Sequence, residues 1–363
     1  MSVYVGIDVH RKRSQVAVVA EDGKVQLNRN VVNGVEPVLK LIGDLPAGTP
    51  VAFEAAFGWG WLVELLESYG FDPHLVHPLR CKAIASARLK NDKVGAAVLA
   101  QLLRADLLPE AWIAPPAVRQ LRALLRHRAS LVRLGTQLRN RIHAVVADFG
   151  HDRAGTYWTG PGRGWLAGLD LPPVSREIVT DCLAVIDSLA VTIDRLDAQV
   201  RAHAKAGPRV KTLTALPGVG QFTALVMLAE IGDITRFPSA RKLASWAGLT
   251  PAVRGSDLTV RHGHISKQGP AWLRWVLNQA AQTAKRSPEF AATCTAIAKR
   301  RGNKIATMAI ARKLLTRAYH LLATQAASTS GAAAPPHRPE GSPAPGELAT
   351  RHEPASGRAR SSD

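Results

Sequence analysis

Three acidic residues of the N-terminal region occupy positions from which they could bind a metal ion. Asp8 ends the first β-rich run, Glu54 ends the fourth, and Asp92 begins the last helical stretch. Clustered carboxylates are costly unless a cation neutralises them, and their oxygens suit Mg²⁺. A pair of such ions can activate an attacking oxygen and stabilise a leaving oxygen in phosphodiester cleavage. Because a single strand-end aspartate is more often a turn or cap residue, the joint placement carries the prediction.

The elements between these residues determine whether the carboxylates meet. The pattern predicts strands over 3–9, 15–20, 25–32, 50–54 and 74–77, and helices over 35–45, 61–69 and 92–105. Three strands, helix, strand, helix, strand, helix is the order of an RNase H-like α/β fold. In such a sheet the first and fourth strands are neighbours and the last helix packs across the same edge. We therefore expect Asp8, Glu54 and Asp92 to converge on a metal site.

A second set of residues could handle a phosphate. Ser256 lies in a glycine-containing segment rich in cationic side chains, namely Arg254, Arg261, His262, His264 and Lys267. Such cations can hold a phosphate for attack and stabilise developing charge, and a serine hydroxyl can be the attacking group. No neighbouring residue is an evident base for the hydroxyl. An ordinary loop serine and a nucleophile therefore both stay open.

The segment Leu216-Pro-Gly-Val-Gly-Gln221 precedes an apolar helical stretch over 222–231. This pattern resembles a helix-hairpin-helix turn, in which backbone amides beside Gly218 and Gly220 approach a phosphate, helped by the following helix N-terminus. The alternative is an ordinary turn between two helices.

Charge indicates the class of partner. Of 363 residues, 47 are Lys or Arg and 28 are Asp or Glu, a formal net charge of +19. Such an excess favours a nucleic acid, because neutralised phosphates release condensed counterions. No run approaches about 18 uncharged apolar residues, and the N-terminus runs directly into a strand, so we expect a cytoplasmic protein. The three cysteines are too widely spaced for a disulfide framework or a zinc knuckle.

The middle and end of the chain read as helices followed by a tail. An arginine-rich helix is predicted over 118–149, and a second helix carries an apolar repeat at heptad positions over 179–200. Joined by a Gly- and Pro-rich loop, they suggest an antiparallel hairpin, which is either a spacer within one protomer or a dimer surface. Residues 207–322 are predominantly helical. Beyond them Ala, Pro, Gly, Ser and Arg dominate, which predicts disorder.

An ordered series of motifs resembles the RuvC-like DEDD transposases of insertion sequences, recombinases that are guided by a bridge RNA. The resemblance spans residues 3–322. The matching motifs are Gly6-Ile-Asp8, Phe53-Glu54-Ala55, Lys90-Asn-Asp92, Leu216-Pro-Gly-Val-Gly220, Ala229-Glu-Ile-Gly-Asp233 with Arg236-Phe237, Ala247-Gly-Leu-Thr-Pro251, Ile265-Ser-Lys-Gln-Gly269 with Leu273-Arg274, and Ala311-Arg-Lys-Leu314.

The resemblance implies roles for particular residues. Asp8, Glu54 and Asp92 would bind Mg²⁺, and Ser256 would join transiently to DNA. The site would be composite, with the nuclease domain of one protomer meeting the serine domain of another, so a dimer or tetramer is expected. The arginine-rich helix, including Arg126 and Arg133, would contact DNA or a structured guide RNA.

The same resemblance implies four regions. They are a RuvC-like nuclease domain over 1–112, a helical coiled-coil linker over 113–206, a transposase domain with the serine loop over 207–322, and a tail over 323–363.

Two positions depart from the family pattern. Gly95 stands where a fourth acidic residue is expected, one helical turn after Asp92, and Asp257 follows the serine in place of glycine. Since glycine has no side chain to bind a metal, one alternative is a catalytically impaired copy that still binds nucleic acid. A second is a structure-selective nuclease, such as a Holliday-junction resolvase, that uses only the carboxylates.

Overall fold

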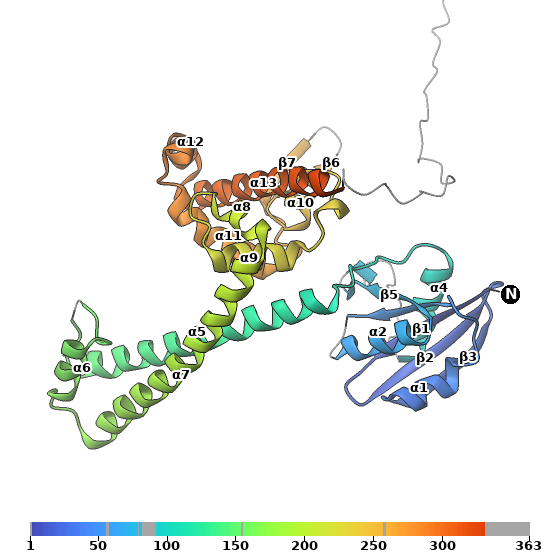
Figure 1. The fold of residues 1–363 in the computed structure, drawn as a ribbon, viewed down its shortest axis with the longest axis horizontal. Helices are drawn as coiled ribbons and strands as arrows, with labels where there is room; N and C mark the ends of the chain where they lie inside the picture. The colour runs from blue at the N-terminus through green and yellow to red at the C-terminus, as the bar shows by residue number, and fades with distance from the viewer. Residues whose placement is uncertain are drawn as a thin grey trace, which may run out of the picture. The chain divides into compact units, whose positions relative to one another are not determined.

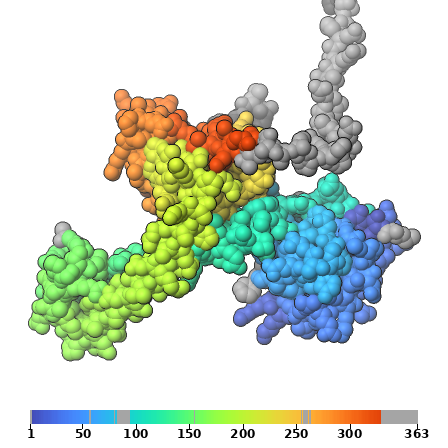
Figure 2. Space-filling view, viewed as in Figure 1, coloured from blue at the N-terminus to red at the C-terminus, as the bar shows by residue number. Residues whose placement is uncertain are grey.

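The computed structural model describes residues 2–55, 58–78, 80–81, 92–153, 155–256 and 259–330. The chain forms two compact units, Met1–Leu121 and Arg122–Asp363, and the division falls inside one long helix. Figure 1 shows the elements of each unit, and Figure 2 shows the same parts as space-filling surfaces.

Unit 1 is built on a five-stranded sheet with the order β3-β2-β1-β4-β5. Its strands are β1 (Val3–Val9), β2 (Arg13–Ala20), β3 (Val25–Val32), β4 (Pro50–Glu54) and β5 (Asp72–Val76). The first three strands pair antiparallel, whereas β4 pairs parallel with both β1 and β5. The expected order of elements and the neighbouring first and fourth strands are confirmed.

One face of this sheet carries most of the apolar core of unit 1. Because side chains alternate along a strand, Val5, Ile7 and Val9 of β1 point to one side, and all three are buried. They pack with side chains of α1 (Val35–Ile42) and α2 (Trp59–Ser68). Each fully buried branched side chain contributes about 1.5–3 kcal/mol to folding.

The opposite face is covered by α4 (Asp92–Arg104), and Gly6 allows this contact. A Cβ atom at Gly6 would collide with the backbone oxygen of Ala96 and lie 2.7 Å from the backbone nitrogen of Ala100. The helix backbone therefore rests directly on the middle of β1. Because residues two apart share a face of a strand, Asp8 lies on this same side of the sheet.

Unit 2 begins with a helical hairpin. α5 (Pro116–Asp148), which starts in unit 1, and α7 (Pro173–Ala206) are joined through the short α6 (Gly160–Ala167), as Figure 1 shows. The two long helices are confirmed, whereas the expected Gly- and Pro-rich loop between them contains the helix α6. The far end of the hairpin has its own apolar cluster, in which Tyr157 is fully buried and its hydroxyl donates a hydrogen bond to Asp152.

Two arginines interrupt the apolar seam of α5, and each has a partner. Arg128 donates two hydrogen bonds to the carboxylate of Asp197 on α7, at 2.8 and 3.1 Å. The guanidinium of Arg139 lies 5.5 Å from the ring centre of Trp158. The seam is therefore held partly by a paired charge and a cation–π contact, not by apolar packing alone.

The rest of unit 2 is mainly helical. Its helices are α8 (Pro208–Thr214), α9 (Gln221–Ile231), the 3₁₀ helix η1 (Ile234–Arg236), α10 (Ala240–Trp246), α11 (Ala271–Ala284), α12 (Pro288–Arg301) and α13 (Asn303–Ser330). In the part of the chain that the structure describes, no helix is long and apolar enough to cross a membrane.

Two expectations for this region require correction. The serine segment is a β-hairpin, β6 (Pro251–Ser256) and β7 (Thr259–Ile265), not a loop. β-branched residues and alternating side chains favour this pairing, a signal hidden by the two glycines of the segment. In addition, α13 continues to Ser330, so residues 323–330 are helical although they were expected in the tail. Residues 331–363 lie outside the described part.

We predict that Gly6→Ala lowers the free energy of unfolding by about 1–3 kcal/mol, because the added Cβ meets backbone atoms that cannot rotate away. Thermal unfolding of the full chain measures the loss. Gly164→Ala in α6 is the matched control, since its Cβ has no neighbour within 4 Å and alanine is favoured over glycine in a helix by up to about 1 kcal/mol. Equal stability of the two variants would contradict the close contact.

Candidate active site and nucleic-acid interface

Asp8 and Glu54 lie side by side at the carboxyl edge of the sheet. The parallel register pairs Gly6 with Ala52 and Ile7 with Phe53, which brings the next residues of the two strands to the same level. Ala52 packs against Leu99 of α4, so the face shared by Gly6, Ala52 and both carboxylates is the face that α4 covers. The side chain of Asp8 is 21% exposed, and Glu54 is half-buried.

The first turn of α4 lies against Asp8. A Cβ atom placed on Gly95 would be 2.7 Å from Oδ2 of Asp8 and 3.5 Å from its Cγ. Position 95, where the family pattern has an acidic residue, therefore faces the first carboxylate directly. Asp92 stands three residues earlier, on the same side of the helix, and its side chain lies outside the described part.

The oxygen donors at this edge suit a hard cation, but they are fewer than the four acidic residues expected. Carboxylate oxygens are the ligands that Mg²⁺ prefers, and Asp8 and Glu54 supply them from adjacent strands. Gly95 supplies none. Among residues whose side chains are described, no group of three or more His, Cys, Asp or Glu side chains forms a metal cluster. The residues fit a divalent ion only together with Asp92.

Two further side chains surround the carboxylates. Nε2 of His10 lies 3.7 Å from Oδ2 of Asp8, a distance at which protonated histidine would form an ion pair. Cys81 is buried beside Ala52 and Leu99; burial raises the pKa of its thiol, and the charge of Glu54 raises it further. Sequence reasoning missed His10, although its position two residues after Asp8 was a usable signal. The raised pKa keeps Cys81 a neutral core thiol.

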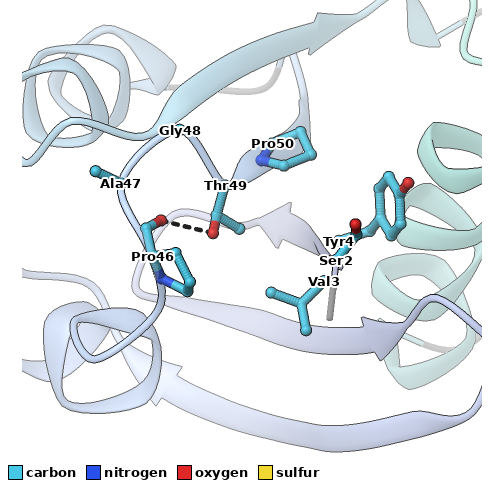
Figure 3. Close-up of a pocket in the computed structure, with 8 residues that line it drawn as sticks. All are labelled: Ser2, Val3, Tyr4, Pro46, Ala47, Gly48, Thr49 and Pro50. Atoms are coloured by element: carbon cyan, nitrogen blue, oxygen red, sulfur yellow. Dashed lines mark hydrogen bonds between the residues drawn. The ribbon is translucent and has the colours of Figure 1, made fainter.

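A hollow at the opposite edge of the sheet has a different character. Figure 3 shows it at the amino ends of β1 and β4, lined by Ser2, Val3, Tyr4, Pro46, Ala47, Gly48, Thr49 and Pro50. Its volume is about 410 Å³, and the hydroxyl of Thr49 donates to the carbonyl oxygen of Pro46 at 2.7 Å. These lining residues include no charged side chain, so the hollow supplies neither a carboxylate ligand for a metal ion nor a cation for a phosphate.

The β-hairpin formed by β6 and β7 brings together several of the residues expected around a phosphate. Its register places Arg254 opposite Arg261 and Ser256 opposite Thr259. In this register, position 256 lies two residues beyond the pair formed by positions 254 and 261, at the end of β6. Like charges at opposed positions are unfavourable unless an anion lies between them. The side chains of Arg254, Ser256 and His262 lie outside the description.

Backbone contacts hold the base of the hairpin. Arg274 donates three hydrogen bonds, to the carbonyl oxygens of Ala247, Gln268 and Gly269, at 3.1, 2.8 and 3.0 Å. A Cβ atom on Gly248 would lie 2.7 Å from the backbone nitrogen of Gln268, and one on Gly269 would collide with the carbonyl oxygen of Trp246. These glycines and the arginine therefore serve the fold of the hairpin base.

Lys267 belongs to the same base. Its side chain is exposed, and its φ of 55° is unusual for a residue other than glycine. Its amide donates to the carbonyl oxygen of Gly248 at 3.2 Å. The hairpin base thus presents a cation beside the strand that carries Arg261, and the phosphate role of Lys267 stays a prediction.

Three arginines, Arg122, Arg126 and Arg236, lie at the C-terminal end of α9. Arg122 donates to the carbonyl oxygens of Ala229 and Glu230 at 2.8 and 3.2 Å, and Arg236 donates to that of Ile231 at 3.1 Å. Cations are favourable at this negative end of a helix. Burial, with repulsion from Arg122, lowers the pKa of Arg236 to about 10. The Ala229–Asp233 motif with Arg236 is therefore the end of a helix with its cationic cap.

The buried carboxylate of Glu230 completes this group. Glu230 is 4% exposed and forms an ion pair of 2.6 Å with Arg126. Arg126, expected at a nucleic-acid surface, thus has a structural partner, although 54% of its side chain remains exposed. Arg133, two turns further along α5, is exposed. Sequence reasoning missed Glu230 because nothing local indicates that a helical glutamate is buried.

The two glycines before α9 differ in their surroundings. Gly218 has φ of +74°, and its Cβ would collide with the carbonyl oxygen of Ala280 on α11 and lie 3.1 Å from the nitrogen of Ala284. Gly220 is exposed and a Cβ there would meet nothing within 4 Å. The first glycine is required by packing against α11, whereas the second leaves backbone open to a ligand.

Known proteins with similar sequences were found for most of the chain. Residues 5–150 match the family model of the DEDD transposases of IS110 type, described as "Transposase". Residues 210–294 match the model described as "Transposase IS116/IS110/IS902 family".

Curated relatives agree with both matches. The transposase for insertion sequence element IS1111A of Coxiella burnetii is 26% identical over 90% of this chain and 91% of its own length. The probable family 20 transposase of Pseudomonas aeruginosa is 28% identical over 65% of this chain and 71% of its own length. The pilin gene-inverting protein of Moraxella bovis is 32% identical over 36% of this chain and 43% of its own length.

We predict that Glu230→Gln lowers the free energy of unfolding by about 3 kcal/mol, because Arg126 then lacks its buried ion-pair partner and Arg122 a nearby negative charge. Denaturant unfolding of the full chain measures the change. Glu64→Gln is the matched control: it also breaks an Arg–Glu pair, Arg119 at 3.0 Å, but its carboxylate is 65% exposed and the cost should be about 0–1 kcal/mol. A cost as small for Glu230 would show that the buried pair is dispensable.

We also predict opposite behaviour for the two glycines before α9. Gly218→Ala should cost about 1–3 kcal/mol in stability, because its Cβ meets the α11 backbone. Gly220→Ala should fold normally and weaken binding of duplex DNA, measured by fluorescence anisotropy at fixed salt. Unchanged binding by Gly220→Ala would mean that this segment is an ordinary turn between helices.

Proposed function

We propose that this chain, whose residues 5–150 and 210–294 match models of transposase families, cuts and rejoins DNA strands to move an insertion sequence. The observation that carries the proposal is that Asp8 and Glu54 follow paired residues of two neighbouring strands at one sheet edge, beside a helix whose first turn faces Asp8. Carboxylates so placed serve phosphodiester cleavage. The net charge of +19 suits a DNA partner.

The nuclease step would use the carboxylates of unit 1. Asp8, Glu54 and Asp92 would hold a divalent ion, in the cell Mg²⁺, which neutralises charge on the scissile phosphate. Asp8 and Glu54 are oriented by the sheet, and Asp92 by the start of α4. Nε2 of His10, 3.7 Å from Oδ2 of Asp8, lies at the rim of the site.

The joining step would use the β-hairpin formed by β6 and β7 in unit 2. The hydroxyl oxygen of Ser256 attacks the phosphorus of a DNA phosphodiester, and the bond to the departing strand breaks as its oxygen takes up a proton. A hydroxyl of the new partner strand then attacks the serine-linked phosphorus and releases the serine. Arg254 and Arg261, opposed in the hairpin, would neutralise the phosphate during both steps.

Partners follow from the same proposal. A structured guide RNA would bind exposed cations such as Arg133 on α5, and a second copy of the chain would complete the site by bringing the hairpin of one protomer to the carboxylates of another. The apolar heptad positions of α7 offer the contact between copies, because Leu189 and Ile193 are only partly buried within one chain.

Gly95 favours a second candidate, a copy that binds nucleic acid but cannot cut it. Position 95 faces Asp8, so an aspartate there would add a fourth oxygen ligand where glycine adds none. The contact is with the far end of the Asp8 side chain, which can rotate. Gly95→Asp is therefore sterically feasible. A nuclease that uses the carboxylates alone is the third candidate, and it differs by not needing Ser256.

The experiment is excision from the native element, scored by PCR across the circle junction. We expect circles from the unmodified chain, their loss in Ser256→Ala, and more of them in Gly95→Asp. Circles only with Gly95→Asp would establish the impaired copy, and circles that persist in Ser256→Ala would refute the serine as nucleophile. Thr259→Ala, opposite Ser256 in the hairpin, is the control for the fold of this segment.

A further inference from the structure

The surface of α11 carries two stacked tryptophans that the proposed chemistry does not use. The ring centres of Trp272 and Trp275 lie 5.2 Å apart with an angle of 22° between the planes, and Trp275 is 48% exposed. Phe222, at the start of α9, meets Trp272 edge-on at 6.3 Å. Trp272 therefore packs against Phe222, and Trp275 is exposed to solvent.

The core of unit 2 does not need these rings. The opposite side of α11 supplies the packing through Leu273, Val276, Leu277, Ala280, Ala281 and Ala284, all buried. Exposure of an apolar indole ring to water is unfavourable. A half-exposed pair of tryptophans beside a well-packed core is therefore typical of a binding surface.

The neighbourhood of the rings indicates what could bind. Residues 267–288 contain no Asp or Glu, and the face of Trp272 and Trp275 continues at helical spacing to Gln279 and Gln282, both exposed. Lys285 donates to the side chain of Gln282 at 2.6 Å, and Arg286 follows, exposed. The strip thus passes from stacked rings to amides and then to cations.

The C-terminal half of α11, where the strip becomes cationic, adjoins the glycine turn. α9 and α11 lie side by side in Figure 1, and Gly218 rests on the α11 backbone at Ala280 and Ala284. The guanidinium of Arg128 lies 5.0 Å from the ring centre of Phe222. At the tryptophan end, the Arg128 guanidinium, which also pairs with Asp197, therefore packs on the aromatic group, while Lys285 and Arg286 supply cations at the far end of the strip.

We propose that Trp272 and Trp275 form a stacking platform for unpaired bases of a single DNA strand, whose phosphates run toward Lys285 and Arg286. Base faces stack on indole rings whatever their sequence, and flanking cations follow the backbone. The choice of DNA rests on the proposed function, since cutting and rejoining strands leaves unpaired DNA near unit 2. An apolar protein partner would meet amides and cations instead of a continuous apolar surface along this face.

The test measures binding of fluorescently labelled oligo-dT to the full chain without Mg²⁺, by anisotropy at fixed salt. Trp275→Leu keeps apolar bulk but removes the ring, and should weaken oligo-dT binding roughly tenfold, while Trp275→Phe should bind within about threefold of the unmodified chain. Tyr69→Ala, an aromatic residue of similar exposure at the end of α2, should bind normally. Duplex DNA binding should be unchanged in all three variants.

Charge and fluorescence give independent readouts. Arg286→Gln should reduce the slope of affinity against salt by about one, the contribution of one phosphate contact. Binding should quench tryptophan emission in the unmodified chain and less so in Trp275→Phe. Equal affinity of Trp275→Leu and Trp275→Phe would overturn the stacking proposal, as would an equal loss of duplex binding.

Three further measurements distinguish single-stranded DNA from other ligands of this face and test the proposed function separately. Tighter Trp275-dependent binding of oligo-rU than of oligo-dT would overturn the assignment to DNA. A dimer that dissociates in Trp275→Leu would show that the face is a contact between copies. Failure of the unmodified chain to form circles, together with an intact effect of Trp275→Leu on oligo-dT binding, would count against the proposed recombinase activity and not against the stacking platform.

Discussion

The contact of one strand backbone with one helix backbone determines the active edge of unit 1. Only glycine at position 6 lets α4 lie on β1, because any side chain there would strike Ala96 and Ala100. With the helix at that distance, its first turn reaches Asp8, and Gly95 sits against the carboxylate. The Gly-Ile-Asp motif therefore combines a packing residue and a chemical residue two positions apart on one face of the strand.

Because α4 packs so closely on the sheet, the residue at position 95 directly affects the surroundings of Asp8. An acidic residue there would stand against Asp8, where the two charges repel unless a cation lies between them. Glycine removes the repulsion and the ligand together. The Asp8 carboxylate therefore meets no like charge from position 95.

Several motifs shared with the transposases serve the fold of unit 2. Arg122, Arg126 and Arg236 gather around the end of α9 because its terminal carbonyls, which have no partner within the helix, and the buried Glu230 together present negative charge. Arg274 ties three carbonyls beneath the hairpin in the same way. These guanidinium groups fix the scaffold from which the serine hairpin and the aromatic face of α11 project. A resemblance carried by motifs thus mixes structural and chemical residues.

The sequence by itself determined the order of elements in unit 1, the two long helices, and the convergence of Asp8 and Glu54, because alternation and helical periodicity are local properties. It predicted a loop where a hairpin forms, since the glycines of that segment mask the alternation. It could not separate Gly218, which packs on α11, from Gly220, which does not, nor find the buried partner of Arg126. Those distinctions depend on residues 50 to about 100 positions away, which only the tertiary structure brings together.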